Sequence, residues 1–170
     1  VMSDPTYESA EEYLRDADAA LYHAKDIGRG RVEVFDKQLR EKILQRVSIE
    51  QKLRKAIDAD ELVMHYQPII QLQDQKIVGC EALIRWQPPG ENIISPGHFI
   101  PVAEDSGLIH ILGAWILEKA CAQLMSWNQK NIVADDFSMS INVSGVQIID
   151  SNFAQLVENI ITEIGVNPAQ

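Results

Sequence analysis

Residues 61–86 contain two strand-like segments on either side of a short polar turn, and this pairing constrains the fold more than any other feature. The segments are ELVMHYQPII (61–70) and KIVGCEALIRW (76–86), and the residues between them include the polar sequence LQDQ. Runs rich in β-branched and aromatic residues that flank such a turn are typical of a β-hairpin. We therefore expect an antiparallel pair of strands here.

The region after the hairpin alternates between helical and strand-like patterns. Ser95 and Pro96 are expected to open a short helix that ends near Glu104, and Gly107 separates it from a long amphipathic helix that ends near Gln129. A strand is expected at 137–144 and a further helix at 152–164. Strands that alternate with helices indicate an α/β fold with parallel strand pairing.

The first 58 residues have a different pattern. Ser9 and Glu12 have the spacing of a capping box, and the helix that follows is expected to run to Ile27, before a short strand at 31–35. The segment 37–58 is expected to be a helix that holds seven of the fifteen basic residues. Its apolar stripe is broken at two heptad positions, which favours a connecting helix that packs along one side over a coiled coil.

Composition restricts the class of protein. The chain is 46% hydrophobic and 24% charged, as expected for a globular protein, and its formal charge is −10. This charge argues against binding of nucleic-acid polymers, which requires a basic surface. No uninterrupted apolar run reaches the length of a membrane span, and Cys80 and Cys121 lie in apolar segments as expected of core residues. These features favour a cytoplasmic location, with no membrane segment in this chain.

The second strand of the hairpin carries charge on one face. Side chains alternate along a strand, so Glu81, Leu83 and Arg85 share a face, and Cys80 lies on the other. Residues 59–170 hold only four basic side chains, which makes the position of Arg85 informative. Two interpretations are open: a salt bridge along the strand, or a site at which Glu81 meets a cation or a metal.

A polar face is also expected on the strand at 137–144. Ser140 and Asn142 share that face, and Asn142 lies near the carboxyl end of the strand. Its amide oxygen is a hard ligand of the kind that suits Mg²⁺, Mn²⁺ or Ca²⁺. Taken alone, Asn142 is interpreted as a turn-forming side chain at the strand end. Together with Glu81, it is a candidate metal ligand at the carboxyl ends of parallel strands.

Four motifs in this order closely resemble the first half of an EAL domain. They are YQPII, EALIRW, ISPGHFIPVAEDSGLI and INVSGVQ, and the resemblance extends from about Leu53 to the end of the chain. The EAL family consists of bacterial phosphodiesterases that linearise cyclic di-GMP to pGpG on a TIM-like (β/α) barrel with two divalent metals. The resemblance therefore implies an α/β fold that forms part of such a barrel.

The resemblance also implies roles for matching residues. Glu81 and Asn142 would be metal ligands, with Mg²⁺ or Mn²⁺ as the cofactor. Arg85 would hold a phosphate of the dinucleotide, for which the forked guanidinium group is well suited. The positions of Gln67 and Leu83 would line the substrate groove. The resemblance places Pro101 near a guanine.

Other polar residues receive weaker interpretations. The four histidines share no ligand spacing, and His65 is interpreted as a structural residue. Glu104 and Asp105 are interpreted as helix-end residues that bond neighbouring loops, without a catalytic role.

The first stretch resembles the last helix and strand of a GGDEF domain, in the sequence DADAALYHAKDIGRGRVEVFD. Lys25 and Arg29 match positions that meet nucleotide phosphates in that family, although a basic pair near a helix C-terminus is the preferred interpretation. The expected organisation is a GGDEF remnant at 1–36, a connecting helix at 37–58 and the N-terminal half of an EAL domain at 59–170. The parent protein would then carry upstream GGDEF and sensor domains, could be anchored in the membrane by an upstream segment, and could form a homodimer through the EAL domain.

Three functional hypotheses follow. The first is a fragment of a metal-dependent phosphodiesterase that is inactive alone, because a barrel needs roughly 250 residues and later strands would supply the other ligands. The second is a regulatory module that binds cyclic di-GMP or a protein partner without cleavage. The third is a salt-bridged α/β domain unrelated to nucleotides.

Overall fold

The computed structural model describes residues 9–11, 14, 17–18, 20–21 and 37–170. The chain divides into two compact units, Val1–Ile49 and Glu50–Gln170. In the first unit, the described residues between 10 and 21 are helical, as expected, whereas the strand expected at 31–35 lies outside the described residues. Helix α2 (Lys37–Asp58) has the predicted bounds and crosses from the first unit into the second.

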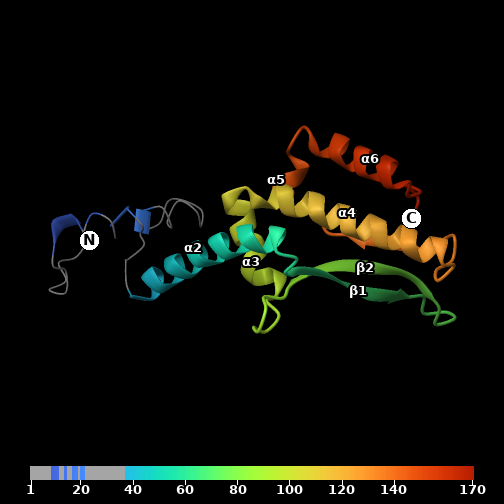
Figure 1. Cartoon of the computed structure of the whole chain (residues 1–170), viewed down its shortest axis with the longest axis horizontal. Helices are drawn as coiled ribbons and strands as arrows, with labels where there is room; N and C mark the ends of the chain where they lie inside the picture. The colour runs from blue at the N-terminus through green and yellow to red at the C-terminus, as the bar shows by residue number, and fades with distance from the viewer. Residues whose placement is uncertain (1–8, 12–13, 15–16, 19, 22–36) are drawn as a thin grey trace. The chain divides into compact units, whose positions relative to one another are not determined.

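A three-stranded sheet forms the framework of the second unit, in the order β1–β2–β3 (Figure 1). Strands β1 (Leu62–Ile70) and β2 (Ile77–Trp86) pair in antiparallel fashion, which confirms the hairpin. Strand β3 (Ser138–Ile141) pairs with β2 in parallel, which confirms the parallel pairing. β2 is therefore the central strand and pairs on both sides.

Three longer helices accompany the sheet: α3 (Pro96–Ser106), α4 (Leu108–Gln129) and α6 (Phe153–Ile164). Gly107, with φ of 75°, ends α3 in the left-handed conformation that favours glycine and allows α4 to start at the next residue. Helix α4 runs along the sheet, and α6 packs on its other side (Figure 1). One face of the sheet is therefore covered by helix.

The predicted strand at 137–144 is shorter in the structure, and a helix that was not predicted follows it. β3 stops at Ile141, so Asn142 lies just beyond the strand, and α5 occupies Gly145–Ile148. Ser144 and Gln147 form a capping box, in which the Ser144 hydroxyl accepts from a backbone N–H of the first helical turn and the Gln147 side chain accepts from the backbone N–H of Ser144. This local hydrogen bonding ends the strand conformation and starts the helix.

The core lies between the covered face of the sheet and helices α4 and α6. Its buried members come from both layers, and they are Cys80, Leu117, Cys121, Leu124, Phe137, Ile160 and Val166. Both cysteines are free and buried, which confirms their expected core position. A second contact joins β2 to α3, where the rings of Trp86 and Phe99 meet edge to face with centroids 5.8 Å apart. Aromatic pairs prefer this geometry because a positive ring edge meets a negative ring face.

Helix α4 supplies much of this core. Its buried residues recur every three or four positions, as in an amphipathic helix that faces a core. Among the described helices, it is also the one long and apolar enough in average composition to cross a membrane, with half of that stretch buried inside the structure. Glu118 and Lys119 interrupt its apolar residues, which is why no uninterrupted run was found in the sequence.

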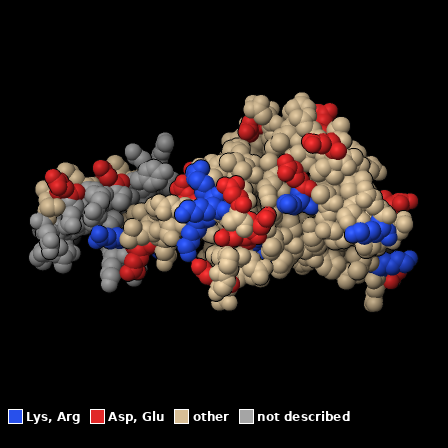
Figure 2. Space-filling view, viewed as in Figure 1, with Lys and Arg blue, Asp and Glu red and all other residues tan. Residues whose placement is uncertain are grey.

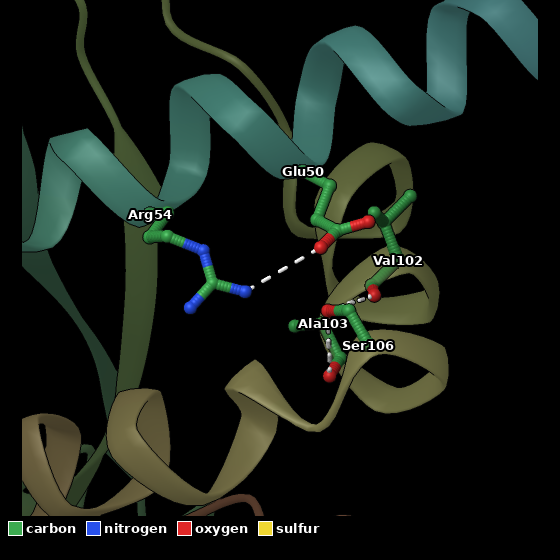
Figure 3. A network of polar contacts seen from close by, with 5 residues as sticks. All are labelled: Glu50, Arg54, Val102, Ala103 and Ser106. Carbon is green, nitrogen blue, oxygen red and sulfur yellow. Dashed lines mark hydrogen bonds and ion pairs between the residues drawn. The ribbon is translucent and has the colours of Figure 1, made fainter.

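The C-terminal part of α2 belongs to the second unit and is anchored there by Leu53 and Ala56, both fully buried. Basic side chains gather over α2, with acidic side chains beside them, on the face drawn in Figure 2. One such pair is internal to the helix, where Arg54 Nη2 lies 3.5 Å from Glu50 Oε1 (Figure 3). Exposed pairs of this kind contribute little to stability, so the buried apolar residues hold this end of α2.

Candidate functional site

Strand register assembles a polar row across the face of the sheet opposite the core. Gln67 of β1 pairs with Glu81 of β2, and Glu81 pairs with Ser140 of β3. Because directly paired residues project to the same face, all three side chains lie on one side of the sheet. We call this side the open face, and the side that packs against α4 the covered face. Gln67 and Ser140 are exposed, and Glu81 is partly buried.

Glu81 and Asn142 meet on the open face. Asn142 Nδ2 donates a hydrogen bond to Glu81 Oε1 at 2.5 Å, across 61 residues of sequence. The two candidate ligands therefore lie side by side. Glu81 was expected at the carboxyl end of its strand but lies in the middle of β2, and Asn142 lies just beyond the end of β3. Among the described residues, Glu81 Oε2 and Asn142 Oδ1 accept no hydrogen bond and remain for another partner. The pair offers two hard oxygen donors at one point on the open face.

Arg85 does not form the salt bridge that was one interpretation of this strand. Its Nη1 donates to the backbone carbonyl of Ile84 at 2.8 Å, and no ion pair joins it to Glu81 or to any other described residue. The spacing permitted a salt bridge, but Glu81 bonds to Asn142 instead. The cation of Arg85 is therefore available to an anion on the open face.

Of the remaining candidate residues, Leu83 lies on the open face with Glu81, whereas Pro101 lies on helix α3. Leu83 lies between Glu81 and Arg85 on β2 and pairs with His65, which is exposed on the same face. Pro101 is exposed on α3. No hydrogen bond or ring contact links Pro101 to the pair of candidate ligands among the described residues. Lys25 and Arg29 lie outside the described residues.

A further polar contact next to Asn142 was not predicted as part of the site. Ser144 Oγ donates to Glu104 Oε1 at 2.5 Å, so the end of α3 is joined to the segment that follows β3. This agrees with the interpretation of Glu104 as a residue that bonds a neighbouring loop. The spacing of Ser144 and Gln147 in the sequence is that of a capping box and could have indicated the start of α5, but it does not indicate the contact with Glu104.

The donor set fits a hard divalent cation, although the described residues supply only part of a shell. Mg²⁺ binds carboxylate and amide oxygens and usually keeps several waters and substrate phosphates as its other ligands. Glu81 and Asn142 match that chemistry. Within the described part of the chain, no group of three or more His, Cys, Asp or Glu residues could hold a metal.

The covered face has the opposite chemistry. Burial raises the pKa of the Cys80 thiol. The pKa of the Tyr66 hydroxyl is also raised, mainly by burial and to a smaller extent by the electrostatic effect of Cys80. Desolvation penalises the ionised form of each group, so both remain neutral in the physiological range. The acidic and basic side chains of β2, Glu81 and Arg85, lie on the open face instead.

Comparison with known proteins relates the chain to a family and to named relatives. The family model described as "EAL domain" matches residues 50–170. The bifunctional diguanylate cyclase/cyclic di-GMP phosphodiesterase MucR of Pseudomonas aeruginosa is 33% identical over 162 residues, covering 95% of this chain and 23% of that protein. The cyclic di-GMP phosphodiesterase PdeR of Escherichia coli is 35% identical over 151 residues, covering 89% of this chain and 22% of that protein.

A solved structure shows the same fold. The phosphodiesterase PaMucR in complex with c-di-GMP superposes with a TM-score of 0.66 at 33% identity, covering 71% of this chain and 48% of that chain. The chain spans between a fifth and a quarter of the length of the two curated relatives and about half of the solved structure.

Proposed function

The chain belongs to the EAL domain family, and from this premise we propose that the protein containing it hydrolyses cyclic di-GMP to linear pGpG. Two relatives at 33% and 35% identity are named cyclic di-GMP phosphodiesterases. Cyclic di-GMP signalling is thus the process in which we place this protein.

The observation that carries the proposal is the contact between Glu81 and Asn142. A carboxylate and an amide held 2.5 Å apart on an uncovered sheet face contribute nothing to the apolar core. Their remaining oxygens suit Mg²⁺ or Mn²⁺. When bound, a pair of such cations supplies an activated water and neutralises charge on the scissile phosphate.

The other residues of the open face bind and orient the dinucleotide in this proposal. Arg85 holds a phosphate through its guanidinium group, which can donate two parallel hydrogen bonds. Gln67, which pairs with Glu81, and Leu83, two residues after Glu81 on β2, line the groove, and Pro101 contacts a guanine. The shared face of Gln67, Leu83 and Arg85 supports the roles of these three residues.

The wider organisation of the protein is also a proposal. We assign residues 1–36 to the end of a GGDEF domain, with Lys25 and Arg29 as candidate phosphate contacts, residues 37–58 to a connecting helix, and residues 59–170 to the N-terminal half of an EAL domain of TIM-like fold. An upstream sensor domain, a homodimer through the EAL domain and a cytoplasmic location of this region complete the proposal.

The test is hydrolysis of cyclic di-GMP by the full-length protein in the presence of Mg²⁺. We expect linear pGpG as the product, and we expect Glu81→Gln to lower kcat by about a hundredfold or more, because the amide is a weaker ligand for a hard cation. Glu118→Gln changes an exposed carboxylate on α4 and is the matched control. The 170-residue chain alone should be inactive, since its described residues supply two candidate ligands.

Two results would contradict the proposal in different ways. Tight binding of cyclic di-GMP without any product would identify a receptor module in place of an enzyme. Neither binding nor hydrolysis by the full-length protein would exclude both functions. Equal kcat values for the unmodified protein and Glu81→Gln would remove Glu81 from the site.

A further inference from the structure

The segment between β3 and α5 has two polar side chains, Asn142 and Ser144, and both form hydrogen bonds. Asn142 donates to Glu81, and Ser144 Oγ donates to Glu104 while it accepts from the backbone N–H of Val146 at 3.2 Å. The backbone N–H of Ser144 donates to Gln147 Oε1 at 3.2 Å. The segment that carries the candidate ligand Asn142 is therefore anchored two residues later by a second carboxylate.

Gln147 fixes the other side of this segment against α4. Its side chain is buried, with 4% exposure, which is unusual for a polar residue. A Cβ atom on Gly113 would lie only 1.9 Å from Gln147 Nε2, so a larger residue at this position of α4 would displace the Gln147 amide. The capping box therefore packs against α4 through Gln147 and bonds to α3 through Ser144.

We propose that Glu104 is a positioning residue, which acts through Ser144 to hold Asn142 in place for metal binding. This inference rests on the proposed function. Glu104 belongs to α3, which also carries Pro101 one turn earlier, so the same contact ties the proposed guanine-binding helix to the proposed metal ligand. Glu104 touches neither metal nor substrate in this role.

A contribution to folding alone is the alternative explanation, and the metal affinity of the folded protein distinguishes the two. A hydroxyl bound to a carboxylate forms a short, charge-assisted hydrogen bond that restricts the geometry of both partners. Groups that orient the ligands of a metal typically change metal affinity or activity 10- to 100-fold when they are removed. A merely structural link would lower thermal stability without altering the metal affinity of the folded protein.

The experiment measures Mn²⁺ binding to the full-length protein by the electron paramagnetic resonance signal of the free ion. We expect Glu104→Ala to weaken Mn²⁺ binding about 10- to 100-fold. Glu104→Gln should recover most of the affinity, because its amide oxygen can still accept from Ser144. Ser144→Ala removes the donor and should reproduce the loss, and Glu118→Ala is the control for an exposed carboxylate on α4.

The outcomes separate the positioning role from the function on which it rests. Unchanged Mn²⁺ affinity in Glu104→Ala and Ser144→Ala, in a protein that binds Mn²⁺ and hydrolyses cyclic di-GMP, would overturn the positioning role alone. An unmodified protein that neither binds Mn²⁺ nor hydrolyses cyclic di-GMP would overturn both. Failure of all the Glu104 and Ser144 variants to fold would assign the contact to structure and would also overturn the positioning role.

Discussion

The two faces of strand β2 carry opposite kinds of side chain. On the covered face, Cys80, Ala82, Ile84 and Trp86 are all buried. On the open face, Glu81, Leu83 and Arg85 are partly buried, and Glu81 bonds to Asn142 rather than to Arg85. Residues one position apart in the chain therefore lie in separate environments.

This difference shows how a single strand can combine a packing face with a polar face. Burial of the covered face supplies the hydrophobic free energy that keeps the sheet against α4. The open face is not needed for that packing, so it can carry a carboxylate and a guanidinium group whose interactions would be costly in a core. Substitutions on one face should mainly change stability, and those on the other should mainly change binding.

The largest expected effect tests the structural half of this comparison. Ile84→Ala should lower the free energy of unfolding by about 2–5 kcal/mol, because it leaves a cavity beneath a residue that is only 6% exposed. Leu83→Ala, at the neighbouring position on the open face, should cost about 1 kcal/mol. Urea denaturation of the chain, followed by circular dichroism, measures both. Equal losses would show that the two faces are not distinct in packing.

A smaller effect tests the binding half. Arg85→Lys keeps the positive charge but removes the forked donor, so affinity for cyclic di-GMP should fall about tenfold, or about 1.4 kcal/mol. Thermal stability should change little, because Arg85 has no ion pair among the described residues. Calorimetry with a non-hydrolysable analogue and the full-length protein provides the measurement, with the exposed Lys130→Arg as the control. Undiminished affinity would exclude a two-pronged phosphate contact.

The smallest expected effect is a pH dependence from the covered face. Burial raises the pKa of Cys80 and of Cys121 above the unfolded value, so their neutral forms stabilise the folded state at pH values below about 8.5. That contribution is lost as the pH rises through the folded-state pKa values. The melting temperature should therefore decline above about pH 8.5, and less steeply in Cys80→Ala.

The pKa of Tyr66 is also raised, so its ionisation contributes to the same decline in melting temperature at high pH. Tyr66→Phe removes its titration and serves as the control. A melting temperature that declines identically in Cys80→Ala and in the unmodified chain would show that the thiol of Cys80 plays no part.

The local pattern of the sequence was sufficient to predict most of the secondary structure. The hairpin, α2 and the break at Gly107 were all visible as alternation, periodicity or a helix stop. The end of β3 was misjudged because its apolar alternation continues through Val143, whereas the capping box of Ser144 and Gln147 redirects the backbone.

The candidate site was only partly predictable because it depends on contacts between distant segments. The shared face of Glu81 and Arg85 followed from strand alternation, and their salt bridge was an open alternative that only three-dimensional contacts could exclude. The contact of Glu104 with Ser144 joins residues 40 positions apart. No periodic pattern encodes such a contact, because it depends on how α3 and the end of β3 come together.

The mixed pairing of β2 has a consequence for the order of folding. The antiparallel partner β1 lies just across a short turn, whereas the parallel partner β3 follows after two intervening helices. Loop-closure entropy and contact order favour early formation of the hairpin and late docking of β3. Glu81 and Asn142, 61 residues apart, would then meet only in a late step. A partly folded chain could already bury hairpin residues while it lacks any metal affinity, so metal binding would report on the completion of folding.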